Sequence, residues 1–80
     1  MSIKTDKVLD QIYAERRRQD HKWGPDRPLS TTPFLAILME EVGEAATDTF
    51  DGSLETLRTE LIQVAAVAVA WIEAIDLELN

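Results

Sequence analysis

Cysteine is absent from this chain of 80 residues, and histidine occurs once, as His21. These absences exclude a disulfide scaffold, a cysteine nucleophile, a thiolate zinc site and a histidine-rich metal site. The absence of cysteine fits a reducing compartment, and the charged N-terminal residues do not resemble a signal peptide, so we expect a cytoplasmic protein. The longest apolar run, 64–72, is shorter than the roughly 18–20 residues of a membrane span, so we expect no membrane partner.

Basic residues are scarce over most of the chain, whose formal net charge is −7. Residues 29–80 contain ten acidic residues and one basic residue, whereas residues 1–28 contain seven basic and five acidic residues. An acidic chain is poorly suited to binding nucleic acid, because neutralising its phosphates requires a basic surface. The uneven distribution instead predicts an N-terminal segment that attracts phosphate groups and a remainder that attracts cations.

Proline and glycine are few, and their positions divide the chain. All three prolines lie within residues 25–33 and Gly24 adjoins them, so residues 21–32 are the expected main loop. Apolar residues elsewhere recur at helical spacing, which predicts helices over 5–20, 33–49 and 54–76. Thr32 is the expected N-cap of the second helix, and Gly52 with Ser53 separates the second helix from the third.

The predicted fold is one all-α domain over residues 1–80, an antiparallel helical bundle of three main helices that is completed by oligomerisation. A chain this short, without disulfides or zinc, is near the lower size limit for a sufficient core, so we expect a homodimer or homotetramer. A small-residue strip, Ala66, Ala70 and Ala74, predicts close approach of a second subunit. The expected core face of the third helix consists of Leu54, Leu57, Leu61, Val64, Ala68, Trp71 and Ile75.

Carboxylates gather in the middle of the second predicted helix, within the sequence EEVGE of residues 40–44. At 100° per residue, Glu41, Glu44 and Asp48 fall within about 60° of one another, beside the core face. Such like charges repel, and a divalent cation would relieve the repulsion; ligands that are all oxygen suit Mg²⁺, with Mn²⁺ as a second option. A glycine among these acids, Gly43, indicates a backbone that some group approaches closely.

An antiparallel third helix would bring Glu60 and Gln63, which lie one turn apart, opposite Glu41 and Glu44. This arrangement would place a carboxylate–amide pair opposite a carboxylate pair. The alternative interpretation, a solvated acidic face of an ordinary surface helix, stays open.

The motif EEVGE…ELIQ resembles the signature of the MazG-like all-α nucleoside triphosphate pyrophosphohydrolases, in the short form found in phages and mobile elements. The upstream segment ERRRQDHKWG and the alanine-rich ELIQVAAVAVAWIEAI resemble the corresponding segments of that branch, so the resemblance extends over residues 10–76. The resemblance implies hydrolysis of nucleoside or deoxynucleoside triphosphates to the monophosphate and pyrophosphate, as a house-cleaning activity on the nucleotide pool. It also implies that the reaction depends on Mg²⁺.

Carried over residue by residue, the resemblance implies that Glu41, Glu44, Glu60 and Gln63 bind the metal. Gln63 stands where the family motif usually has Asp; an amide oxygen brings no charge, so weaker binding of Mg²⁺ is expected. Glu40 and Glu41 are the candidate catalytic residues, as the general base that accepts a proton from the attacking water.

The basic N-terminal segment supplies the expected substrate-binding residues. Arg16 and Lys22 are candidates to bind the β- and γ-phosphates, Trp23 to stack on the nucleobase, and Gln19 to hydrogen-bond the base or sugar. Two further functions stay open: a nucleotide- or metal-binding module weakened in catalysis by Gln63, and an acidic helical protein whose alanine strip docks a partner polypeptide.

Overall fold

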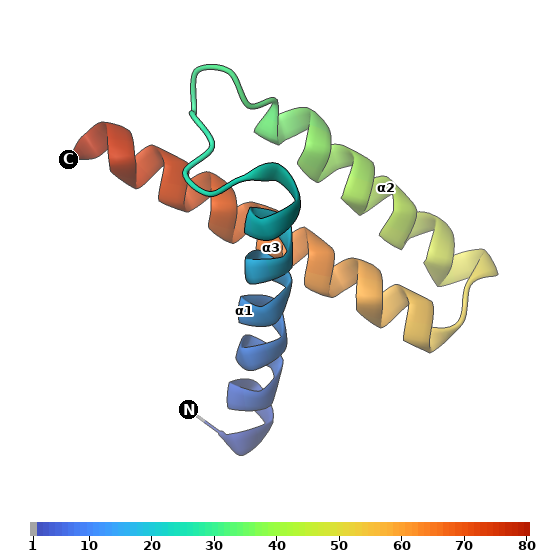
Figure 1. The fold of residues 1–80 in the computed structure, drawn as a ribbon. Helices are drawn as coiled ribbons and strands as arrows, with labels where there is room; N and C mark the ends of the chain where they lie inside the picture. The colour runs from blue at the N-terminus through green and yellow to red at the C-terminus, as the bar shows by residue number, and fades with distance from the viewer. Residues whose placement is uncertain (1) are drawn as a thin grey trace.

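The computed structural model describes residues 2–80, and within them it contains three helices and no strand (Figure 1). The helices are α1 (Ile3–Trp23), α2 (Phe34–Asp51) and α3 (Leu54–Leu79). The prediction of an all-α chain with three main helices is therefore confirmed. Helices α2 and α3 form an antiparallel hairpin, and α1 crosses α3 steeply near its middle (Figure 1). Both α1 and α2 pack on α3, and within the described residues they do not pack on each other.

The helix ends follow local chemistry, and five of the six lie one to three residues from the expected boundaries. Helix α1 continues to Trp23, so His21, Lys22 and Trp23 form its last turn instead of belonging to the loop; it ends where Gly24 adopts a φ of 88°. Helix α2 begins at Phe34 with Pro33 at its N-cap, because Pro33 has a non-helical ψ of 65°. The prediction that Thr32 is the N-cap is therefore wrong.

The turn between α2 and α3 is short, which keeps the two helices side by side. Ser53 caps α3 as expected: its hydroxyl accepts from the backbone N–H of Thr56 at 3.1 Å, and the hydroxyl of Thr56 accepts from the N–H of Ser53 at 3.0 Å. Gly52 is needed here, because a Cβ at this position would lie 2.7 Å from the hydroxyl oxygen of Thr56. The register of the hairpin is thus fixed next to the acidic residues.

The core is small and consists mainly of alanine. Its buried apolar residues are Phe34, Ala45, Ala66, Val67, Ala70 and Ala74. Phe34 stacks on Trp71 with ring centroids 6.0 Å apart and an angle of 8° between the rings. The alanine strip is therefore covered within the chain, so its predicted contact with a second subunit or a partner polypeptide is wrong. Small side chains are needed on this face because α3 packs against both other helices.

Several of the larger apolar residues of α3 are left outside the core. Leu54 is 84% exposed and Leu61 52% exposed, although both were expected in the core. The chain has 5878 Å² of solvent-accessible surface, whereas a compact monomer of its mass has about 4,850 Å². Its radius of gyration, 13.5 Å, also exceeds the about 11.6 Å typical of a domain of this length. The folded chain therefore exposes more surface than a compact monomer does.

Within residues 2–80, no helix combines the length and the apolar character that crossing a membrane requires.

Candidate functional site

Three carboxylates meet across the α2–α3 hairpin. Glu41 and Glu44 lie one turn apart on α2, and Glu60 comes from the facing turn of α3. One oxygen from each of the three lies within 4.8 Å of the other two. The structure thus brings together the three glutamates expected to bind a metal. The short turn at Gly52 is what aligns them, because it pairs the second half of α2 with the first half of α3.

Gln63 completes this cluster on the α3 side. With its amide nitrogen turned toward the carboxylates, Gln63 donates to Oε2 of Glu41 at 2.9 Å and to Oε2 of Glu60 at 3.0 Å; this orientation is assigned from the hydrogen-bond partners. The amide then places partial positive charge between two carboxylates. For Gln63 to bind a cation instead, the amide has to turn and present its oxygen. Gln63 therefore belongs to the cluster.

The charges of the cluster oppose one another. Burial raises the pKa of Glu41, and the neighbouring carboxylates Glu44 and Glu40 raise it further. The pKa of Glu44 is raised chiefly by its contact with Glu60, and burial is the main cause that raises the pKa of Glu60. All three groups hold protons more tightly than an ordinary glutamate does. A proton or a cation at the cluster would therefore relieve the repulsion.

A small cavity of about 40 Å³ joins this cluster to the last turns of α1. Glu41 and Gln63 line one side of the cavity, and Gln19 and Trp23 line the other. Gln19 is the only polar residue that is buried among residues 2–80. The Lys22 ammonium lies 4.6 Å from the ring centroid of Trp23. Two of the four expected substrate-binding residues thus share a cavity with two of the expected metal ligands, and a third lies against Trp23.

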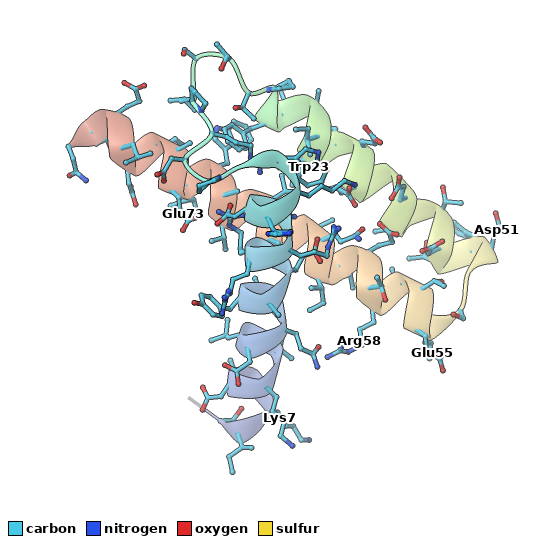
Figure 2. All side chains as sticks on the ribbon, in the orientation of Figure 1. Lys7, Trp23, Asp51, Glu55, Arg58 and Glu73 are labelled. Carbon is cyan, nitrogen blue, oxygen red and sulfur yellow. The ribbon has the colours of Figure 1, made fainter. Side chains whose placement is uncertain are left out.

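Arg16 lies elsewhere. Its guanidinium donates to Oε1 of Glu73 at 2.7 and 2.9 Å, forms an ion pair with Asp20 at 2.9 Å, and donates to Gln19 at 3.2 Å. It lines a second, larger cavity of about 310 Å³ between the loop and the C-terminal half of α3. Figure 2 shows Glu73 and Trp23 on opposite sides of the end of α1. Arg16 thus lines the larger cavity and not the small one.

Two arginines that line the small cavity, Arg18 and Arg27, are not among the predicted substrate-binding residues. Three consecutive arginines on a helix point in three directions, so only the packing of α1 on α3 decides that Arg18, and not Arg16, faces Glu41. Arg27 lies in the loop, directly before Pro28, where no periodicity predicts its direction. Its guanidinium carbon lies 5.5 Å from the ring centroids of both Trp23 and Phe34.

Two other expectations are changed by the structure. Glu40 is exposed and is not among the three carboxylates that lie within 4.8 Å of one another. Gly43 is also exposed, and a Cβ on it would meet no atom within 4 Å, so no group of the described chain makes the predicted close approach.

Comparisons of the chain with protein families, with curated proteins and with solved structures found no match.

Proposed function

We propose that the cluster of Glu41, Glu44 and Glu60 binds Mg²⁺ or Mn²⁺ and that the protein is a nucleoside triphosphate pyrophosphohydrolase. The observation that carries the proposal is the convergence of three carboxylates from two helices next to a cavity lined by arginine and tryptophan side chains. The donor set fits the metal, because three carboxylates and one amide supply only oxygen ligands once the amide of Gln63 is turned. The motif resemblance supplies the reaction, hydrolysis to a nucleoside monophosphate and pyrophosphate.

Each residue of the site then has a chemical task. A bound divalent cation would neutralise phosphate charge and polarise the reacting phosphate. Glu41 belongs to the cluster and also lines the cavity, so it is better placed than the exposed Glu40 to accept the proton of the attacking water. Trp23 is half exposed at the edge of the same cavity and offers its ring to a nucleobase. The substrate would be an NTP or dNTP of the cytoplasmic pool.

Self-association is the second part of the proposal. On α3, large apolar side chains lie on the face opposite Ala66 and Ala70: Leu54, Leu61, Ile72, Ile75 and Leu79 are all exposed. The exposed surface exceeds that of a compact monomer by about 1,000 Å², and a typical interface buries about 800 Å² per partner. The excess exposed surface therefore supports a homodimer or homotetramer in which this face is covered.

A weaker catalyst is the second candidate function. Gln63 bridges Glu41 and Glu60 through its amide nitrogen, and this hydrogen bonding partly replaces a cation. A chain with this residue binds Mg²⁺ less tightly than one with Asp, and then acts as a nucleotide- or metal-binding module.

A panel of nucleoside and deoxynucleoside triphosphates, assayed for pyrophosphate release with Mg²⁺, separates the two functions. Release from at least one nucleotide, lost in Glu41→Gln, supports the enzyme. Thermal stabilisation by nucleotide with Mg²⁺ but without release supports the binding module.

A further inference from the structure

The arginines near the two cavities differ in whether they have a partner. Arg16 is neutralised by Asp20 and Glu73, and Arg18 by Glu15 at 2.7 Å. Arg27 is half-buried, yet no carboxylate of residues 2–80 lies within 4.0 Å of its guanidinium. Among the arginines that line a cavity in this part of the chain, it alone has an unpaired charge.

Aromatic rings hold this guanidinium in place. It lies over Trp23 and Phe34, each with its ring centroid 5.5 Å away, and Phe34 is itself fixed by stacking on Trp71. Contacts of this kind engage the flat face of the guanidinium and leave its N–H donors, which lie in the plane, free for an oxyanion. Burial, followed by repulsion from Arg16, also lowers the pKa of Arg27, and a bound anion would reverse this effect.

Arg27 lies between two cavities, and the charges that line each cavity indicate which of them binds an anion. The residue lines both cavities. The larger cavity also has four carboxylates in its wall, from Asp20, Asp26, Glu73 and Asp76, which disfavour an anion there. The small cavity has two carboxylates in its wall: Glu15, which is paired with Arg18, and Glu41, a proposed metal ligand.

We infer that Arg27 binds the phosphate chain of the substrate, between the metal cluster and Trp23. The inference rests on the proposed function for the identity of the ligand, but the anion site itself does not. The volume of the small cavity, about 40 Å³, has room for phosphate oxygens and not for a base, which leaves the base on the exposed side of Trp23. Arg27 thereby takes the phosphate-binding role that the sequence assigned to Arg16.

Pyrophosphate is the probe, and its affinity is measured by isothermal titration calorimetry in the presence of Mg²⁺. Arg27→Gln removes the charge, and we expect it to weaken binding about tenfold or more. Arg17→Gln is the matched control: Arg17 is exposed over Tyr13, outside both cavities, and its loss should change the affinity less than about twofold. If Arg27→Gln does not fold, Arg27→Met keeps an apolar stem against the rings, and the same loss is expected.

The outcomes separate this inference from the proposed function, because binding of pyrophosphate requires no turnover. Pyrophosphate affinity that is unchanged in the folded Arg27 variants, or no binding by the wild type, overturns the role of Arg27. If the wild type hydrolyses no nucleotide but loses pyrophosphate affinity in Arg27→Gln, the anion site stands and the proposed enzyme does not.

Discussion

The amide nitrogen of Gln63 on α3 lies 2.9 Å from Oε2 of Glu41 on α2 when the amide is oriented to hydrogen-bond. This contact joins the two helices of the candidate metal site in the absence of a metal. It also links Gln63 to the carboxylate that belongs both to the cluster and to the lining of the small cavity. An ionised carboxylate at position 63 could not donate this hydrogen bond.

Gln63→Asp should lower the stability of the metal-free protein and raise its affinity for Mg²⁺. The variant replaces two hydrogen bonds to carboxylates by a further negative charge, so the melting temperature in EDTA should fall. One added charge at the metal should raise the affinity for Mg²⁺ about tenfold or more, measured by calorimetric titration. Gln11→Asp, the same substitution at an exposed position of α1, is the control and should change neither quantity. Equal affinities of wild type and Gln63→Asp would remove Gln63 from the site.

Glu44→Gln should stabilise the protein without metal and abolish stabilisation by metal. The substitution removes one of three mutually repelling charges, so the melting temperature in EDTA should rise. For the wild type, Mg²⁺ at ten times its dissociation constant adds about 1.4 kcal/mol, which is about 6–11 °C in a domain of this size. The variant should lose most of this shift, whereas Glu78→Gln, at an exposed residue near the end of α3, should keep it. An equal shift in Glu44→Gln would mean that Mg²⁺ binds elsewhere.

The stability of the metal-free protein should rise as the pH falls toward the ordinary glutamate value of 4.5. The pKa values of Glu41, Glu44 and Glu60 are raised in the folded chain, so the native state binds more protons than the unfolded state in that window. The contribution of these groups is therefore greatest below the unfolded pKa and is lost as the pH rises through the folded values. Thermal unfolding in EDTA between neutral pH and pH 4.5 measures it. A smaller rise in Glu44→Gln is the expected control, and an identical pH profile for both proteins contradicts the assignment.

Ile72→Lys should dissociate the proposed oligomer. Ile72 lies on the exposed apolar face of α3 and is 57% exposed, so a lysine there is tolerated in the monomer but charges the contact. Leu77→Lys is the matched control, because Leu77 is on the same helix with the same exposure, 57%, but belongs to the side that faces the larger cavity. Sedimentation equilibrium should show association for the wild type and the control, and a lower mass for Ile72→Lys. A monomeric wild type at high concentration would exclude the proposed assembly.

The sequence predicted the helical class, the hairpin turn and the meeting of Glu41, Glu44 and Glu60, because these depend on local periodicity and on one short connection. It did not predict which face of α3 is buried. That helix is apolar nearly all round after residue 63, so periodicity alone could not decide between its alanines and its leucines. The packing of α1 and α2 on α3 determines which face of α3 is buried, because two helices on the same side of α3 require small side chains there.

The residues that line the small cavity were predicted only in part, for the same reason. Gln19 and Trp23 lie on the last turns of α1 and line the small cavity together with Glu41 and Gln63. Arg18, and not Arg16, lines the small cavity because of the angle at which α1 crosses α3. The position of the Arg27 side chain depends on the path of the loop, where the sequence has no helical periodicity that could predict it.

Release of pyrophosphate from nucleoside triphosphates is the decisive test of the proposed hydrolase. Wild type and Glu41→Gln are incubated with a panel of NTPs and dNTPs in Mg²⁺, with Glu78→Gln as the control. We expect release of pyrophosphate and a nucleoside monophosphate from at least one member of the panel by the wild type and the control, and a loss of at least about 100-fold in Glu41→Gln. No release by the wild type from any nucleotide, or full activity of Glu41→Gln, would contradict the account.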